Sequence, residues 1–126
     1  MRLRDLVTSE EEWRSYRQTL TSFSTFLERC VDYLLGARRI GEQAASQDGR
    51  LHHATTLLLA RHVAEMADGV AVLAKGGAAM PCPPLLRSAF EAWLGIHYIL
   101  ETDAERRALA YQVEYAHQRQ SFLRRF

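Results

Sequence analysis

One segment of this chain places an arginine and a glutamate a single helical turn apart among apolar side chains. Arg87 and Glu91 lie in the stretch from Pro83 to Glu101, where leucine, isoleucine and aromatic residues fill most other positions. Residues four apart share one face of an α-helix, so the two charges can pair with each other or act together on a ligand. Ionisable groups in an apolar setting are also candidates for acid–base chemistry. We therefore take this pair as the centre of a candidate polar site.

A second charged stripe runs along the preceding segment, in which nearly every other residue is leucine, valine, methionine or alanine. This stripe consists of Arg61, Glu65 and Asp68. If the segments 50–75 and 84–101 form an antiparallel hairpin, these charged residues come level with Arg87 and Glu91. We predict contacts between Asp68 and Arg87 and between Arg61 and Glu91. The complete candidate polar network consists of Arg61, Glu65, Asp68, Arg87, Glu91, Tyr98 and Arg119.

Three interpretations of this network stay open. Both stripes could face water as surface pairs, worth about 0–1 kcal/mol each. They could be buried together and fix the register of the two helices, which is weak evidence for stability. They could instead line a pocket that binds a ligand or transfers protons. The sequence assigns no catalytic residue.

Other residues with suitable chemistry give weaker patterns. Glu114 and His117 have the spacing of a di-iron ligand pair but fall on the outward side of their helix, so we expect no metal and no cofactor. His62 and His97 lie on apolar sides of their helices and are expected to be core histidines. Gln112 and Arg119 interrupt an apolar face; Arg119 either lays its stem on the core with its head in water or joins the network of Arg87.

The chain is expected to be all-α, because hydrophobic residues recur with the helical period and no segment alternates as a strand does. Thr8 and Ser9 are each followed three residues later by glutamate, which predicts a helix start. Thr102 and Glu105 form a second arrangement of this kind. We predict an antiparallel up-down four-helix bundle, with helices from Thr8 or Ser9 to Gly36 or Gly41, over 50–75, over 84–101 and from 103 onward, and a loop over 43–49.

The whole chain, residues 1–126, is expected to be a single helical domain. The helical pattern still runs at Phe126, which suggests a truncated helix or one completed by a partner. The segments 50–75 and 84–101 are too apolar all round for a minimal monomer, so we expect a homodimer that uses the third or fourth helix.

Charge and cysteine content narrow the function. A net charge of +1 gives no field that would concentrate nucleic acid or membrane around the protein. Two cysteines and no apolar signal core near Met1 lead us to expect a cytoplasmic protein with no membrane segment. An arginine-rich end could form a small RNA patch, but acidic residues share it; the arginines are Arg38, Arg39, Arg50, Arg106 and Arg107.

The pattern Arg-x-x-x-Glu at 87–91, then Tyr-Ile-Leu-Glu at 98–101 and Glu-Arg-Arg-Ala-Leu-Ala-Tyr at 105–111, resembles a bacterial family of small helical proteins. That family is described only as a domain of unknown function and is loosely similar to the HEPN-like bundles of toxin–antitoxin and phage-defence systems. The resemblance covers roughly Leu51 to Arg119. The HEPN ribonuclease signature, an arginine five to seven residues before a histidine, is absent, so ribonuclease activity is not implied.

The function expected from these observations is a non-enzymatic α-helical interaction module. The resemblance adds a place in a bacterial defence or toxin–antitoxin system. Two alternatives stay open: a divergent nuclease or small-molecule hydrolase that uses the Arg87 and Glu91 site, and an RNA-binding helical bundle.

Overall fold

The structure, a computed structural model, describes residues 9–125 apart from the side chain of Asp48. Within that range it contains four α-helices and no strand, as predicted. The predicted helix start at Thr8 and the apolar position Phe126 lie outside the described residues. The helices are α1 (Glu10–Asp48), α2 (Leu51–Lys75), α3 (Cys82–Glu101) and α4 (Ala104–Leu123).

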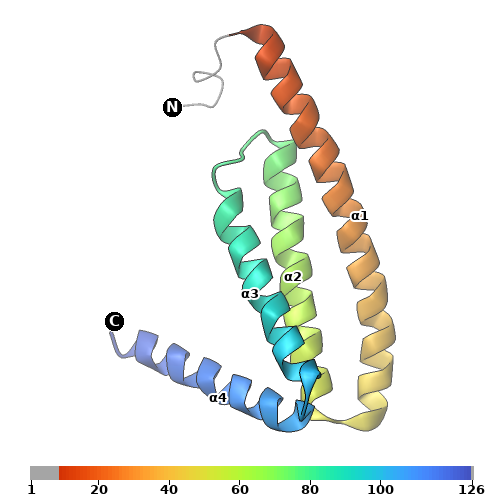
Figure 1. Ribbon diagram of the computed structural model, residues 1–126, viewed down its shortest axis with the longest axis vertical. Helices are drawn as coiled ribbons and strands as arrows, with labels where there is room; N and C mark the ends of the chain where they lie inside the picture. Colours follow the sequence, from red (N-terminus) through yellow and green to blue (C-terminus); the bar gives the residue numbers. More distant parts are fainter. Residues whose placement is uncertain (1–8, 126) are drawn as a thin grey trace.

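Helix α2 is the centre of the molecule. It packs against each of the other three helices, and α4 packs against α2 and α3. Figure 1 shows α1, α2 and α3 side by side, with consecutive helices running in opposite directions, while α4 turns away from the lower end of α3. The antiparallel up-down bundle of four helices is therefore not confirmed, because α4 lies across one end instead of alongside the others.

Helix α1 is longer than predicted. It begins after Ser9, whose hydroxyl oxygen accepts a hydrogen bond from the backbone N–H of Glu12 at 3.2 Å, as the sequence indicated. The predicted loop over 43–49 is wrong, since the helix continues to Asp48 and ends where Gly49 adopts a left-handed φ of 61°. Alanine in this segment favours a helix, and glycine tolerates the left-handed conformation that ends one. Gly41 has a packing role inside the helix, because a Cβ there would lie 2.8 Å from Leu57 Cδ2.

Small residues let α1 and α2 approach closely. Ser24 is buried and its hydroxyl donates to the carbonyl oxygen of Ala71 at 2.8 Å. Ala64, Ala71 and Ala74 on α2 are also buried. The resulting core is thin, so many larger apolar side chains remain exposed to solvent.

The predicted capping of α4 by Thr102 and Glu105 is not formed. The residue before the helix is Asp103, with a left-handed φ of 52° and no side-chain capping bond. Glu105 instead reaches the start of α2, where its Oε1 lies 2.7 Å from His52 Nδ1 and accepts a longer bond of 3.4 Å from the His52 backbone N–H. This contact ties the first turn of α4 to the first turn of α2.

Replacing Glu105 with glutamine should remove part of the acid sensitivity of the fold. The hydrogen bond from His52 lowers the pKa of Glu105 below its ordinary value of 4.5. A carboxyl whose pKa is lower in the folded than in the unfolded state stabilises the fold above its unfolded pKa, and this contribution is lost as the pH falls through the folded pKa. Denaturant unfolding of Glu105→Gln should show lower stability than the native chain at pH 6 and a shallower decline below pH 4.5.

The matched control is Glu114→Gln, because Glu114 is an exposed carboxylate on the same helix that bonds only to the nearby Gln118. This variant should follow the pH profile of the native chain. Identical profiles for the two variants would show that the bond to His52 does not stabilise the fold.

No helix within residues 9–125 has both the length and the apolar character needed to cross a membrane.

Candidate functional site

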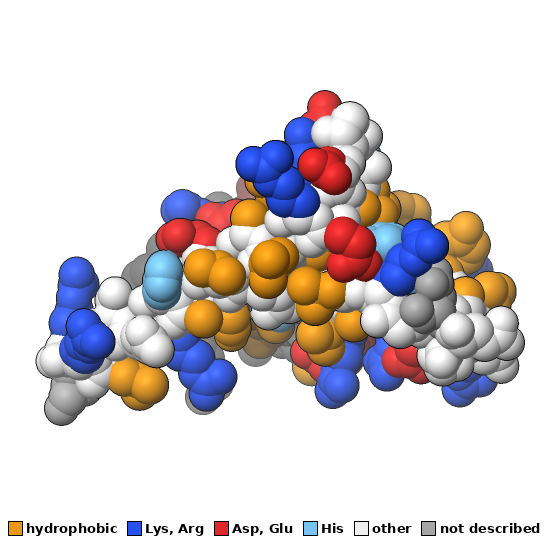
Figure 2. Space-filling model, turned by 90° about the horizontal axis from the view of Figure 1, so that it is seen from below, with side chains coloured by type: hydrophobic (Ala, Val, Ile, Leu, Met, Phe, Trp, Pro, Cys, Tyr) orange, Lys and Arg blue, Asp and Glu red, His pale blue; other side chains and the backbone are white. Residues whose placement is uncertain are grey.

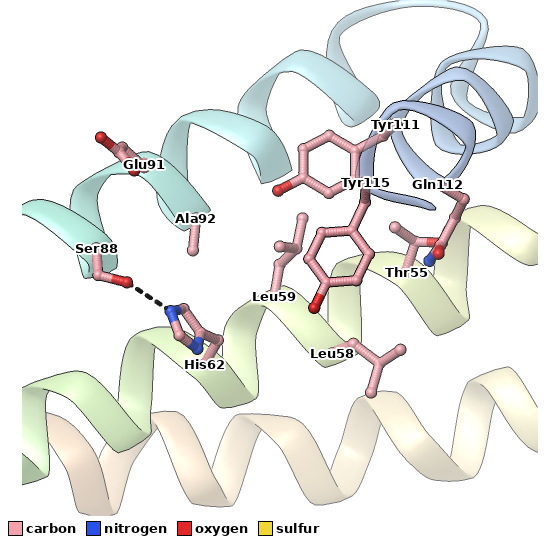
Figure 3. A pocket seen from close by; sticks show the side chains of 10 residues that line it. All are labelled: Thr55, Leu58, Leu59, His62, Ser88, Glu91, Ala92, Tyr111, Gln112 and Tyr115. Carbon is pink, nitrogen blue, oxygen red and sulfur yellow. Dashed lines mark hydrogen bonds between the residues drawn. The ribbon is translucent and has the colours of Figure 1, made fainter. Parts of the chain in front are cut away.

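A cavity of about 390 Å³ opens where α4 separates from α2 and α3. We call it the α4 groove. Figure 3 shows side chains from all three helices pointing into it, and more of its exposed surface is apolar than polar. An apolar cleft with a few polar groups is the usual form of a small-molecule site. The groove is lined by Thr55, Leu58, Leu59, His62, Ser88, Glu91, Ala92, Tyr111, Gln112 and Tyr115.

A histidine and a serine meet at one end of the α4 groove. His62 on α2 and Ser88 on α3 lie with Nε2 and Oγ 2.8 Å apart (Figure 3), a separation that would suit a base and a nucleophile. A catalytic set also needs a third group that orients the histidine. Among the described residues no carboxylate bonds to His62, and Glu91 is bonded to Arg87 instead. The pair forms a hydrogen-bonded link between the two helices.

The other end of the groove is closed by α4. Gln112 donates from Nε2 to the hydroxyl of the buried Thr55 at 3.2 Å, which explains why an amide interrupts the apolar face of this helix. Tyr111 packs on the backbone of Gly95, where an added Cβ would lie 3.0 Å from its ring. Burial raises the pKa of Tyr111, with smaller contributions from Tyr115 and Glu91, so the groove disfavours an added negative charge.

The predicted charged contacts between α2 and α3 are wrong. Arg61 bonds to Glu65 at 2.6 Å and Arg87 to Glu91 at 2.8 Å, each within its own helix and at the surface. Asp68 is also exposed and does not meet Arg87 within the part of the chain described. The predicted alignment of α2 and α3 along their length was nearly right, because Gly69 lies against Leu85 and Gly95 against Leu59.

The error lies in the predicted rotation of α2 and α3 about their own axes, which decides which side chains of each helix face the other. Small and apolar residues face inward, since burying the charges would cost more desolvation energy than their pairing returns. At the surface Arg61 and Arg87 each pair with a glutamate four residues further along the helix. The hydrogen bond from Arg61 lowers the pKa of Glu65.

The last two members of the predicted network lie apart from the others. Tyr98 is half exposed, and the guanidinium of Arg107 sits 4.7 Å from the centre of its ring. Arg107 also donates to the carbonyl oxygen of Tyr98 and to Glu101, both within 2.8 Å. Arg119 lies exposed in the second half of α4, and the charged partner of Arg87 among the described residues is Glu91. The candidate polar network as predicted is not a single site.

Within residues 9–125 no three histidine, cysteine, aspartate or glutamate side chains come close enough to hold a metal ion. Glu114 and His117 are exposed, as the sequence indicated. His97, expected in the core, is exposed and packs on Trp93 with ring centres 4.2 Å apart.

The outer face of α3 carries a second feature that sequence analysis did not identify. Five residues spaced alternately by four and three positions lie in a row on this face, and we call them the α3 seam: Leu86, Phe90, Trp93, His97 and Leu100. All five are exposed, Phe90 at 55 % and Trp93 at 45 %. Phe90 stacks on Trp93 at 5.7 Å, so the aromatic rings form a continuous surface with His97.

Apolar side chains are exposed elsewhere too. Figure 2 shows a row of them across the middle of the lower face, with charged side chains around it. Helix α4 crosses this face and exposes Leu109 and Val113. Helices α3 and α4 therefore both expose apolar side chains to solvent.

The geometry thus defines an all-α protein with an open groove at α4 and an uncovered apolar face on α3. Residues 53–126 match the protein-family model described as "Family of unknown function (DUF5677)". The match covers more than half of the chain, and the chain belongs to this family. It includes nearly all of α2 and all of α3 and α4, which form the groove and the seam. No curated protein and no solved structure matches the chain.

Proposed function

We propose that this chain is a non-enzymatic α-helical interaction module that associates with a second copy of itself through the α3 seam. The observation that carries the proposal is the row of exposed apolar side chains with alternating spacing of four and three. That spacing keeps apolar residues along one line of a helix and is the pattern by which two helices pack in a coiled coil. Burying such a row removes apolar surface from water at roughly 25 cal/mol per Å².

Another exposed stripe, on α1, supports association less well. Phe26, Tyr33 and Ile40 are exposed at intervals of seven. A coiled coil needs two apolar positions in every seven residues; the second positions on this stripe are Phe23, the half-buried Cys30 and Ala37, and two of these three side chains are small. Helix α1 also lies outside the matched family range, whereas α3 lies inside it.

The proposal includes a cytoplasmic location and the bacterial defence or toxin–antitoxin context that the HEPN-like resemblance implies. In an assembled pair, the α3 seam of each chain would be covered by the seam of the other copy, on the side of α3 away from α4. This arrangement accounts for helices that are more apolar than a monomer of four helices needs.

The enzymatic alternative ranks second. It is favoured by the 2.8 Å contact between His62 and Ser88 in an open groove. It is opposed by the absence, among the described residues, of a group that orients His62. The RNA-binding alternative is opposed by the ion pairs Arg38–Glu42 and Arg107–Glu101, which neutralise part of the arginine-rich end.

Sedimentation equilibrium of the native chain and of Trp93→Glu tests the proposal. We expect the mass of two chains for the native protein and of one chain for the variant, because two buried glutamates in the seam would lack partners. The control is Phe26→Glu, which places the same charge on an exposed aromatic position of α1. It should leave the dimer intact, and circular dichroism should show that all three proteins are folded.

A native chain that stays monomeric at several hundred micromolar, or a dimer that Trp93→Glu leaves unchanged, would contradict the proposal. Loss of the dimer in Phe26→Glu, but not in Trp93→Glu, would show that the interface lies on α1.

A further inference from the structure

We infer that the two copies pack with their α3 helices antiparallel, and that Arg87 of each chain pairs with Glu101 of the other. This inference rests on the proposed function, since it concerns the arrangement of the same interface. It is carried by the charges that border the α3 seam, by the position of α4 and by the exposure of the paired residues.

The border of the seam is charged at both ends and apolar in the middle. Arg87, Leu94 and Glu101 each follow directly after a seam residue, at intervals of seven, and all three are exposed. They form one line along the edge of the seam. The line is positive near the start of α3, apolar at its centre and negative at its end.

In an antiparallel pair related by a two-fold axis, the positive end of this line on one chain lies beside the negative end of the same line on the other chain. With the axis near Gly95, Phe90 lies opposite the partner's Leu100 and Trp93 opposite the partner's His97. In antiparallel coiled coils, the border residues on one edge of the seam face the border residues on the same edge of the partner helix. Arg87 then faces the partner's Glu101, and Leu94 faces the partner's Leu94. The two-fold axis makes each charged contact twice.

A parallel pair offers no such match. Its border residues face those on the other edge of the seam, where α3 carries Ala89 and Ile96. Neither can pair with Arg87 or Glu101. Electrostatic complementarity therefore selects the antiparallel arrangement, and its main effect is on orientation and choice of partner.

Helix α4 leaves the seam free. Successive residues turn by about 100° around a helix, so positions two apart lie on nearly opposite sides. Each of three seam residues is followed two positions later by a buried residue: Phe90 by Ala92, Trp93 by Gly95 and His97 by Ile99. Gly95 is the position on which Tyr111 of α4 packs. A second copy on the seam therefore approaches α3 from the side away from α4.

Both charged residues are available for a new partner. The side chain of Arg87 is 82 % exposed and that of Glu101 is 72 % exposed, and their present contacts are surface pairs with Glu91 and Arg107. Arg107 keeps its bond to the Tyr98 carbonyl if Glu101 turns away. Re-pairing at the surface therefore leaves the core of each chain unchanged.

Charge exchange in the full chain tests the arrangement. In sedimentation equilibrium, Arg87→Glu alone and Glu101→Arg alone should each weaken the dimer by about tenfold, because like charges then face each other at two symmetric places. The double variant R87E/E101R should bind within about threefold of the native chain, because both pairs are restored with opposite sense. An equal mixture of the two single variants should form the mixed dimer in preference to either pure dimer.

The matched control is R87E/E91R, which restores the pair within the helix but leaves like charges facing across the interface. It should stay as weak as Arg87→Glu alone. Recovery in this control and not in R87E/E101R would mean that Arg87 acts only within its own helix, and would overturn the inference.

The two proposals fail in different ways. A native chain that is monomeric removes the proposed function and this inference together. A native dimer that Trp93→Glu disrupts, but that the single charge variants leave unchanged, keeps the α3 seam as the interface and rejects the antiparallel arrangement.

Discussion

Ile99→Ala should lower the free energy of unfolding by about 2–5 kcal/mol, the cost of deleting a fully buried branched side chain and leaving a cavity. Ile99 has no exposed surface and is the largest of the fully buried side chains among the described residues. It sits near the end of α3, where that helix meets both α2 and α4. Domains of this size are typically stable by about 5–15 kcal/mol, so the loss would be a large part of the total.

Urea denaturation followed by circular dichroism measures this effect, at one protein concentration because dimer formation adds to apparent stability. Leu109→Ala is the control, since leucine is an isomer of isoleucine and Leu109 is 56 % exposed on α4. It should change stability by about 0.5 kcal/mol or less. Equal losses in both variants would mean that Ile99 is not the centre of the core.

The number and type of the elements could be predicted from periodicity alone. Turn residues also marked the right places: Ser9 caps α1, and the glycines at 76 and 77 lie where α2 ends. The end of α1 was missed because its last turns are polar and carry little hydrophobic pattern. There a surface pair, Arg38–Glu42, and the tolerance of alanine and glutamine for helix keep the chain helical.

The level of α3 against α2 could be predicted from the length of the connection, but the rotation of each helix could not. A helix that is apolar on most sides gives no strong hydrophobic direction, so charges are an ambiguous guide to its inner face. In this protein the size of the side chains decides which face of α2 and of α3 turns toward the other helix. Gly69 and Gly95 accept leucine side chains from the opposite helix, and the charges turn to water.

The α4 groove could not be predicted because it depends on the direction of a whole helix. His62 and Gln112 each stood out by residue type, yet nothing in the sequence linked them to each other or to Ser88. The α3 seam could have been found, since its alternating spacing is present in the sequence. It was missed because the charges of Arg87 and Glu91 were treated as the main feature of this helix, and the apolar residues beside them were assigned to the core.

Gly95→Val should displace α4, because Tyr111 of that helix packs directly on Gly95. A Cβ at this position would lie 3.0 Å from Cε2 of Tyr111, 3.2 Å from Cδ1 of Leu59 and 3.3 Å from the Tyr111 hydroxyl. Valine adds two further carbons, so the ring of Tyr111 has to leave the surface of α3. Overpacking of this kind costs about 1–3 kcal/mol of stability. Release of Tyr111 from its buried place should also return its raised pKa toward 10.0, which ultraviolet titration measures.

Gly36→Val is the control, because Gly36 is an exposed helical glycine where an added Cβ meets nothing within 4 Å. It should leave both the stability and the tyrosine titration close to native. The contact itself is tested by a double-mutant cycle with Tyr111→Ala, since removal of the ring should relieve most of the overpacking caused by Gly95→Val. Strictly additive losses in that cycle would show that Gly95 does not hold α4 in place through Tyr111.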